Sequence, residues 1–235
     1  MDIHEQKELE RVKTEFLSLA SHQLRAPLSN LKWYMDFLLK RRTDQMSPEV
    51  QEYMHKMYRR NNDMAELVNT LLNMSRIEMG RIKVEKEQAD VADIMKSVVE
   101  ELENEATDKK IALESSYSGD SIMHTDRRLV RIILQNLLSN AFRYTNEGGK
   151  VHVRMLASSA KIRIEVEDSG IGIPPDEQSK IFSKMYRAEN AKAFEANGNG
   201  IGLYMCKELV ENMGGEISFI SRMNEGTTFF VDLLR

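Results

Sequence analysis

The chain has 235 residues, 41% of them hydrophobic and 30% charged, so it can form one or two ordinary cores but is too charged to span a membrane. Its net charge of −4 gives no electrostatic reason to expect binding to DNA or RNA, and no secretory signal opens the sequence. Cys206 is the only cysteine, which excludes an internal disulfide and favours a reducing, cytoplasmic setting.

The first third of the chain, from residue 5 to about residue 79, shows helical spacing. Alternating steps of three and four residues, the spacing of a coiled-coil seam, connect Leu9, Val12, Phe16, Leu19, Gln23 and Ala26. The same alternation returns at Val50, Met54, Met57, Asn61, Met64, Val68 and Leu71. Between the two series, Ser47 and Pro48 are typical of an N-cap and the first turn of a new helix. The pattern predicts two long helices joined by a short turn.

Each of these predicted helices carries an apolar stripe that is too long for one partner helix to cover. We therefore expect two copies of the chain to pair through their helical hairpins, which gives a homodimer built on a four-helix bundle. A monomeric hairpin that packs on its own second domain is the alternative, and the sequence leaves it open.

The rest of the chain predicts a mixed sheet with helices on one face. Hydrophobic and polar residues alternate in "KVHVRMLA" (150–157) and "KIRIEVEDSG" (161–170), as they do in half-buried strands. Two further strand candidates near the end are "EISFIS" and "GTTFFVDLL". Helical patterns cover residues 90–108, 126–144 and 201–213. These elements together favour an α+β arrangement in layers.

Polar side chains with a common chemistry gather in two stretches of this second half. In "NLLSNAFRYT", Asn136 and Asn140 are four residues apart and so share one helix face, with Arg143 and Tyr144 about a turn beyond. Asp168 stands at the end of a predicted strand, in "DSGIGIP". An asparagine pair on a helix is by itself more often a cap or a solvated face.

Glycines form two clusters in the same half of the chain. Gly170 and Gly172 directly follow the strand that Asp168 ends, where the backbone must turn or approach something closely. Gly198, Gly200 and Gly202 precede a predicted helix, whose first N–H groups and positive dipole end suit a phosphate group. A glycine run alone is usually only a turn.

Taken in this order, the stretches resemble the ATP-binding domain of two-component sensor histidine kinases, within the GHKL ATPase superfamily. "NLLSNAFRYT" looks like the N box, "DSGIGIP" the first glycine box, "IFSKMYR" the F box and "GNGIGL" the second glycine box. The early stretch "SHQLRAPL" is similar to the H box. The resemblance covers nearly the whole chain. It implies a coiled-coil lead and a dimerisation and phosphotransfer domain over 1–81, then an ATP-binding two-layer sandwich of the Bergerat type over 82–235.

The resemblance also implies roles for single residues. Asn140 would offer its side-chain oxygen to a Mg²⁺ ion that bridges the phosphates of ATP, and Asn136 would support the same site. Asp168 would accept a hydrogen bond from the adenine amino group. Arg143 and Arg187 would meet the phosphates, with Arg187 nearest the transferred group, where charge peaks in the transition state. The remaining implied nucleotide contacts are Tyr144, Gly170, Gly172, Gly198, Gly200, Gly202 and Leu203.

His22 is implied to be the residue that accepts the phosphoryl group. A neutral imidazole, with a reference pKa of about 6.5, has a lone pair that can attack the terminal phosphate of ATP and form a phosphoramidate. Pro27 cannot donate to the carbonyl of Gln23, so the helix is predicted to bend one turn beyond His22. Such a bend would let an ATP domain reach the histidine. The resemblance also implies a mobile ATP lid over 188–197, which closes over the nucleotide together with Gly198 to Gly202.

Three residues depart from the family's pattern. Gln23 stands where an acidic residue usually follows the histidine, and its amide can hold the imidazole tautomer but cannot offset positive charge on the ring, which predicts a slower kinase. Ala26 replaces the threonine or asparagine that orients a water in relatives with phosphatase activity, which predicts a weak phosphatase. Met185 replaces a phenylalanine of the F box, and it is expected to fill the same apolar space.

Two other functions remain as alternatives. An ATP hydrolase of the same superfamily would have a glutamate as general base where this chain has Asn136, which cannot take a proton. A non-catalytic dimeric scaffold would explain Gln23 and Ala26, but the nucleotide boxes argue against it. If the chain is a kinase, its partner is a response regulator, and Lys32, Met35 and Tyr58 are candidates for the docking surface by position only.

Overall fold

The structure of the protein is a computed structural model, which describes residues 3–42, 46–78, 83–195 and 198–235. The chain divides into two compact units, Met1–Ile82 and Lys83–Arg235, and each is described by itself. In the long helices of the first unit some side chains, that of His22 among them, lie outside the described part.

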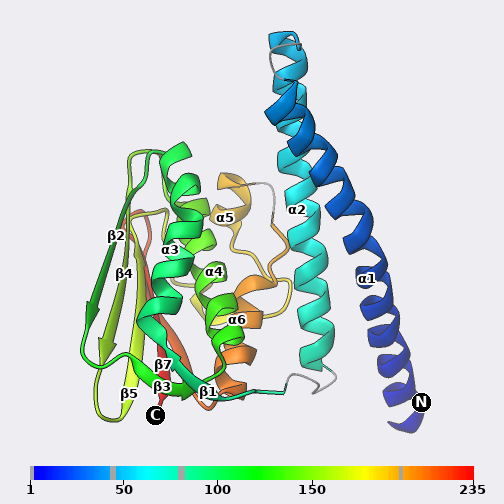
Figure 1. Cartoon of the computed structure of the whole chain (residues 1–235). Coiled ribbons are helices and arrows are strands. Elements are labelled where there is room, and N and C mark those ends of the chain that lie inside the picture. Colours follow the sequence, from blue (N-terminus) through cyan, green and yellow to red (C-terminus); the bar gives the residue numbers. More distant parts are fainter. Residues whose placement is uncertain (1–2, 43–45, 79–82, 196–197) are drawn as a thin grey trace. The chain divides into compact units, whose positions relative to one another are not determined.

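The first unit is a helical hairpin of α1 (Ile3–Arg41) and α2 (Pro48–Glu78), which pack against each other (Figure 1). The predicted start of the second helix is confirmed, because the backbone N–H of Val50 donates to Ser47 Oγ over 3.3 Å and Pro48 is the first helical residue. α1 runs through Pro27 as a single helix. The bend beyond His22 stays a prediction.

The described core of the hairpin contains an amide as well as hydrocarbon. Leu28, Met35 and Val68 are buried, and so is Asn61, which is only 2% exposed. The Nδ2 group of Asn61 donates to the backbone carbonyl of Leu28 over 3.1 Å, while its buried Oδ1 finds no partner among the described residues. A buried amide in a helical seam favours one register of the helices at a cost in stability.

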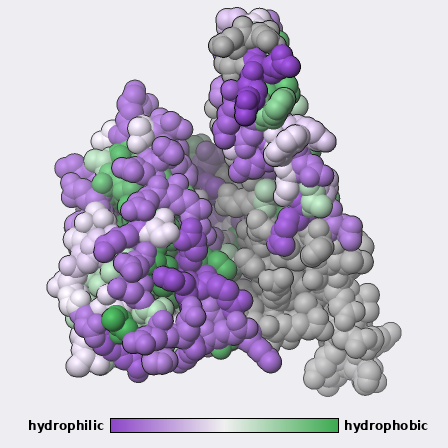
Figure 2. Space-filling view, in the orientation of Figure 1, coloured by the Kyte–Doolittle hydropathy of each residue, from purple (hydrophilic) through white to green (hydrophobic). Residues whose placement is uncertain are grey.

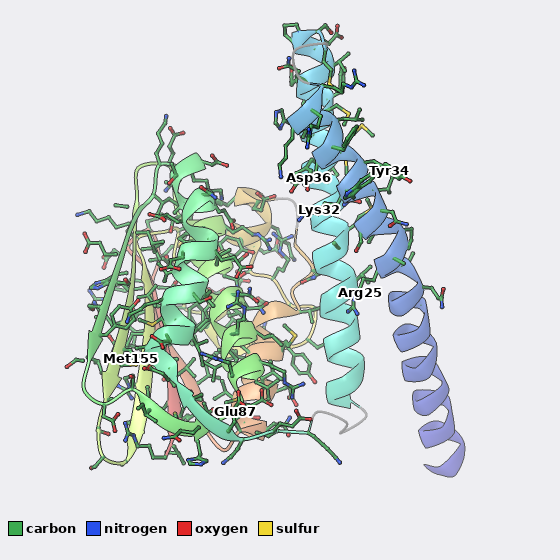
Figure 3. All side chains as sticks on the ribbon, in the orientation of Figure 1. Arg25, Lys32, Tyr34, Asp36, Glu87 and Met155 are labelled. Atoms are coloured by element: carbon green, nitrogen blue, oxygen red, sulfur yellow. The ribbon has the colours of Figure 1, made fainter. Side chains whose placement is uncertain are left out.

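Large apolar side chains remain exposed along both helices of the hairpin. Figure 3 shows Tyr34 on α1, where Trp33 and Phe37 also stack with their ring centroids 5.8 Å apart. The exposed set consists of Leu24, Leu31, Trp33, Tyr34, Phe37, Val50, Tyr53, Met57 and Met64. The two helices of one chain therefore cover only part of the predicted stripes.

The second unit is built on a five-stranded mixed sheet in the order β2-β4-β5-β7-β6. β2 and β4 are parallel and the other pairs are antiparallel. The strands are β2 (Ala112–Ser118), β4 (Lys150–Ala157), β5 (Lys161–Asp168), β6 (Glu216–Arg222) and β7 (Gly226–Leu234). A separate antiparallel pair joins β1 (Glu87–Asp90) to β3 (Ile122–Thr125).

Helices cover one face of this sheet (Figure 1). They are α3 (Val91–Asp108), α4 (Arg127–Tyr144) and α6 (Gly202–Asn212), with the short α5 (Glu189–Phe194) and a 3₁₀ turn at Gln178–Lys180. Asp90 and Asp126 cap α3 and α4 with their carboxylates, which accept N–H bonds from the first turns. The predicted α+β layers are confirmed.

The core of the second unit follows the predicted alternation. Val153 and Met155 of β4 and Ile164 of β5 are at most 1% exposed, and Leu134 and Leu138 of α4 are fully buried. Met155 is labelled in Figure 3. The face of the unit seen in Figure 2 is mostly hydrophilic. This unit buries most, though not all, of its large apolar side chains within one chain.

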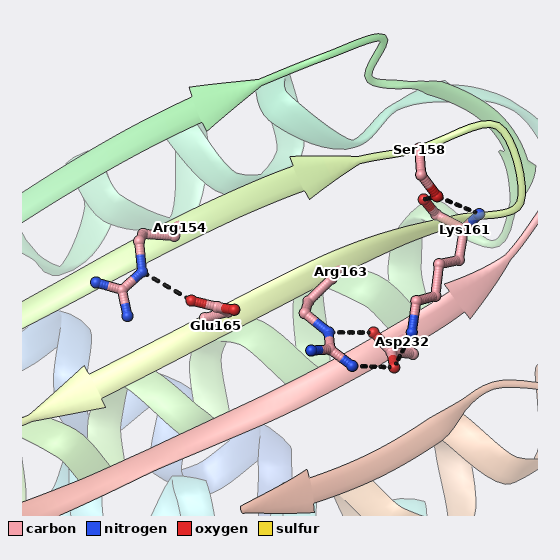
Figure 4. Close-up of polar contacts among 6 residues, drawn as sticks. All are labelled: Arg154, Ser158, Lys161, Arg163, Glu165 and Asp232. Atoms are coloured by element: carbon pink, nitrogen blue, oxygen red, sulfur yellow. Dashed lines mark hydrogen bonds and ion pairs between the residues drawn. The ribbon is translucent and has the colours of Figure 1, made fainter.

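Ion pairs lie across the outer face of the sheet, which the helices leave open. Arg163 and Lys161 of β5 each bind Asp232 of β7 over 2.7 Å, and Arg154 of β4 binds Glu165 over the same distance (Figure 4). The hydrogen bond from Arg163 lowers the pKa of the Asp232 carboxyl. Within the described chain, no helix is both long and apolar enough to cross a membrane.

The structure adds elements that the sequence pattern did not predict, namely β1, β2, β3 and α5. β2 is an edge strand, and most of its side chains are exposed on both faces, so its sequence "ALESSYS" lacks the alternation that marks a half-buried strand. α5 lies inside the predicted lid of residues 188–197. Residues 196 and 197 of that stretch lie outside the described chain.

Candidate functional site

The N-box asparagines lie on one face of α4, beside the start of α6. Asn136 Nδ2 donates to the carbonyl of Ile132 over 2.8 Å, which leaves its Oδ1 toward Gly202. A Cβ added at Gly202 would lie 2.9 Å from Asn136 Oδ1 and 3.8 Å from Asn140 Nδ2. The absence of a side chain at Gly202 permits this close approach, which brings the N box and the second glycine box together. Both asparagines are half-buried.

Asp168 is the last residue of β5, and one of its two carboxylate oxygens accepts hydrogen bonds from the backbone. Its Oδ1 accepts the N–H groups of Gly170 over 2.8 Å and Thr227 over 3.3 Å. Burial raises the pKa of Asp168 to about 6, and the two N–H donors partly oppose that shift. Its Oδ2 accepts no hydrogen bond from the described residues, so it is available to a donor on a ligand.

The first glycine box lies against the end of α4. The N–H of Ile171 donates to the carbonyl of Tyr144 over 3.1 Å, and a Cβ at Gly170 would come within 2.4 Å of the same oxygen. Gly172 has φ +63°, and a Cβ there would lie 2.0 Å from the carbonyl oxygen of Arg222, so only glycine fits. Asp168 is thereby held next to the helix that carries the asparagines.

The other predicted nucleotide contacts lie near Asp168 or near the close approach of Asn136 and Gly202. Arg143 and Tyr144 occupy the last turn of α4, and Leu203 lies in the first turn of α6, all three half-buried. A Cβ at Gly200 would meet the carbonyl of Tyr186 at 2.6 Å, which places the second glycine box against the F box. The structure thus brings all four nucleotide boxes of the second unit together.

Arg187, at the end of the F box, holds backbone carbonyls of the following segment. Its guanidinium donates to Ala191 O over 3.1 Å, to Gly198 O over 3.3 Å and to Glu195 O. Ala191 lies within α5 and Glu195 directly follows its end, so the arginine binds the C-terminal end of α5, which belongs to the predicted lid. Its predicted contact with phosphate stays a prediction.

The H-box residues belong to α1. The backbone of His22 is helical, and its side chain lies outside the described part. Gln23 and Ala26 are exposed in the single chain. The suggestion that Met35 docks a partner is wrong for this chain, because Met35 is buried in the hairpin. Lys32 lies over the ring of Tyr58, 5.5 Å from its centroid.

Met185 contradicts its expected role as an apolar filler. It is 63% exposed and has a positive φ of 59°, so its side chain projects from a tight turn instead of filling a core position.

Sequence reasoning missed two polar contributors to the site. Thr227 binds Asp168 because the β5–β7 register places the two residues opposite each other. Glu177 accepts hydrogen bonds from the F box and from α5. The strand alternation could have suggested the first contact, but the second depends on how a loop folds back on itself.

Two family models match the chain. One is described as "His Kinase A (phospho-acceptor) domain" and matches residues 12–80. The other, "Histidine kinase-, DNA gyrase B-, and HSP90-like ATPase", matches residues 125–235.

Curated relatives match over almost the whole of this chain. "Drug sensory protein A" of Synechocystis sp. (strain ATCC 27184 / PCC 6803 / Kazusa) is 31% identical over 99% of this chain and 36% of its own length. "Signal transduction histidine-protein kinase BarA" of Escherichia coli (strain K12) is 32% identical over 95% of this chain and 25% of its own length. The chain thus spans well under half the length of these relatives.

Solved structures share the fold. Full-length ShkA in complex with AMPPNP has a TM-score of 0.72 at 24% identity, over 93% of this chain and 45% of that chain. The catalytic domain of the histidine kinase ThkA has a TM-score of 0.57 at 26% identity, over 64% of this chain and 97% of that chain.

Proposed function

The chain belongs to the sensor histidine kinases, and from this premise we propose that it is a protein histidine kinase that transfers the terminal phosphoryl group of ATP to His22. The group then passes to an aspartate of a response regulator in two-component signalling. We assign residues 1–81 to dimerisation and phosphoryl acceptance, and residues 82–235 to ATP binding and catalysis.

The proposal rests on one observation: both glycine boxes lie against α4, the helix that carries the two asparagines. α4 presents Asn136 and Asn140 to the start of α6 at Gly202, and its last turn contacts Gly170 beside Asp168. The N–H groups at the start of a helix, with side-chain amides beside them, suit phosphate groups. A carboxylate at the other end of the site, here that of Asp168, suits an amino group. Adenosine phosphates carry both groups.

Asn140 and Asp168 have the chemistry that a magnesium nucleotide requires. Asn140 makes no hydrogen bond within the described residues, so its amide oxygen can serve as a neutral ligand to Mg²⁺, which takes few protein ligands and several phosphate or water oxygens. Bound Mg²⁺ would supply charge neutralisation to the phosphates. The Oδ2 of Asp168 would accept the adenine amino N–H. The residues present therefore fit the group.

The transfer itself exchanges one bond to phosphorus for another. The neutral Nε2 of His22 attacks the terminal phosphorus of ATP, the bond from that phosphorus to the bridging oxygen breaks, and ADP leaves with the bond's electrons. The Nδ1 proton stays on the ring and donates to Gln23. Arg187 stabilises the charge on the transferring group once the nucleotide competes with the lid carbonyls for its guanidinium.

Two helix residues set the expected rates of this kinase. The amide of Gln23 orients the imidazole but adds no negative charge, so phosphoryl transfer is slower than with a carboxylate by about tenfold. Ala26 has no polar atom to orient a water, so dephosphorylation of the response regulator is weak.

The hairpin supports a homodimer and a docked partner. Its exposed apolar side chains on α1 and α2 continue the seam that Leu28 and Met35 begin, and a second hairpin of the same sequence would cover them. A response regulator would then bind the hairpin near Lys32 and Tyr58, which contact each other.

Incubation with ATP labelled in its terminal phosphate tests the proposal. We expect an acid-labile, alkali-stable label on the protein, absent from a His22→Ala variant, and transferable to a receiver domain. Free labelled phosphate without protein label would instead support the ATP hydrolase, and neither product would support the scaffold. Label that persists in His22→Ala would overturn the assignment of His22.

A further inference from the structure

We propose that Glu177 is a positioning residue for phosphoryl transfer, which fixes the chain on both sides of Arg187 and so aims its guanidinium. The proposal rests on the proposed kinase function. Glu177 lies in the turn after the first glycine box, where its N–H donates to the carbonyl of Pro174 over 3.0 Å and its own carbonyl accepts from Lys180 over 3.0 Å.

The carboxylate of Glu177 binds two donors that flank Arg187. The hydroxyl of Tyr186, directly before the arginine, donates to Glu177 Oε2. The backbone N–H of Glu189, two residues after it, donates to Oε2 over 3.1 Å and to Oε1 over 3.4 Å. One side chain therefore fixes the residues on both sides of the arginine.

A second bond fixes the start of α5 to the first glycine box. Asn190 Nδ2 donates to the carbonyl of Gly172 over 2.9 Å. With Glu177, this bond attaches the entrance of the lid to the turn that follows Asp168. The geometry therefore links the adenine side of the site to the arginine expected on the phosphate side.

Charge gives Glu177 an advantage over a neutral acceptor. The hydrogen bond to its carboxylate raises the pKa of Tyr186 to about 12, as expected when a phenol donates to a charged acceptor. A glutamine could still accept from both donors, but less strongly. The conservative variant should therefore retain part of the function.

The positioning role predicts a separation between catalysis and binding. Arg187 is expected to act on the transferring phosphoryl group, whereas Asp168 and the N box hold the rest of the nucleotide. Misplacement of a catalytic group by about 1 Å can cost on the order of 100-fold in rate. Loss of the Glu177 carboxylate should therefore lower kcat and leave ADP affinity almost unchanged.

The test compares variants at Glu177 and Tyr186 with matched controls on the whole chain. We expect Glu177→Ala to lower kcat for autophosphorylation roughly tenfold or more, with KM for ATP and Kd for ADP within about twofold of the parent. Glu177→Gln should recover at least half of the lost rate. Glu211→Gln, at an exposed carboxylate 3.8 Å from Lys207 on α6, should have the parent's values.

Tyr186→Phe removes one donor and keeps the bond from Glu189, so it carries the test if Glu177→Ala does not fold. It should lower kcat at least threefold without changing ADP affinity, while Tyr117→Phe, which loses only an exposed bond to Ser115, should not. Equal rates in Glu177→Ala and Glu211→Gln, or a parallel loss of ADP affinity, would overturn the positioning role. Absence of label on the parent protein would instead contradict the proposed function.

Discussion

The two units of this chain differ in how completely they bury their own apolar side chains. In the unit built on the sheet, residues from β4, β5, α4 and α6 close a continuous core within one chain. In the hairpin, the described core includes Leu28, Met35 and Val68 beside the amide of Asn61, while Trp33, Leu31 and other large side chains stay exposed.

This difference indicates that the two units have different functions. A site that must hold a nucleotide needs side chains and N–H groups fixed to within a fraction of an ångström, and a closed core provides that precision. A hairpin with exposed apolar stripes needs a further surface to cover them. The first unit is therefore where we expect partners to act, and the second is where we expect the nucleotide.

The largest expected effect is on autophosphorylation, and it comes from a substitution in the second unit that should leave the dimer intact. Asn140→Ala should lower autophosphorylation by about 100-fold or more, because the proposed ligand of a phosphate-neutralising Mg²⁺ is lost. Dimer formation, assigned to the hairpin, should be unchanged in sedimentation experiments. Asn212→Ala, at an exposed position on α6, is the matched control and should keep the parent's rate. A normal rate in Asn140→Ala would remove that residue from the site.

The next effect is on dimer affinity, which a substitution in the hairpin should lower and one in the second unit should not. Leu31→Glu in the hairpin should weaken the dimer by about 100-fold, because burial of an unpaired carboxylate costs about 3 kcal/mol. Ile220→Glu, at a side chain that is even more exposed but lies on β6 of the second unit, should leave the dimer intact. Mass measured by light scattering over a concentration series checks both. A Leu31→Glu dimer of unchanged affinity would contradict pairing through this stripe.

Sequence patterns predicted the buried elements well and the exposed ones poorly. β4 and β5 alternate between a solvated face and a core face, so Val153 and Ile164 could be placed from the sequence, whereas the edge strand β2 has too little burial to leave a pattern. The short α5 was also missed, because it has no buried residues of its own. The spacing of hydrophobic residues predicts an element only when one face of that element is buried, so exposed elements such as β2 and α5 leave no pattern in the sequence.

The candidate site shows the same limit. Asn136, Asn140, Asp168 and the glycines could be proposed as site residues from the sequence because they occur in short stretches with a known order. Glu177 lies nine residues before Tyr186, and no spacing rule joins them, since the contact arises only when the loop after the first glycine box folds back. Contacts of this kind depend on tertiary structure, not on local sequence.

A smaller effect tests the chemistry of the hairpin itself. Gln23→Glu should raise autophosphorylation by about tenfold, since a carboxylate both holds the Nδ1 proton of His22 and offsets the growing charge on the ring. Initial rates of label incorporation measure it, with ADP affinity as the control that should not move. A rate that is unchanged or lower would mean that glutamine is the better neighbour for this histidine.

The second unit should show its own dependence on pH. Because burial raises the pKa of Asp168 to about 6, the free carboxyl gains a proton as the pH falls through 6, and adenine then meets a neutral acceptor. ADP affinity should fall by about fourfold between pH 7 and pH 5, since charged acceptors exceed neutral ones by about 1 kcal/mol and the titration is nearly complete over this range. Asp168→Asn should bind more weakly at pH 7 and lose this dependence. A parallel decline in both proteins would assign the titration to the phosphates.

The smallest expected effect concerns the amide in the hairpin core. Asn61→Leu should raise the free energy of unfolding of the hairpin by about 1 kcal/mol, because the gain from removing a buried, unbonded Oδ1 exceeds the loss of one hydrogen bond to Leu28. Trp33 is the only tryptophan of the chain and lies on α1, so its fluorescence during urea unfolding reports on the hairpin. Nucleotide affinity, which belongs to the other unit, should be unchanged. A destabilised hairpin would mean that Oδ1 has a partner in the assembled dimer, and the amide would then be part of the interface between the two chains.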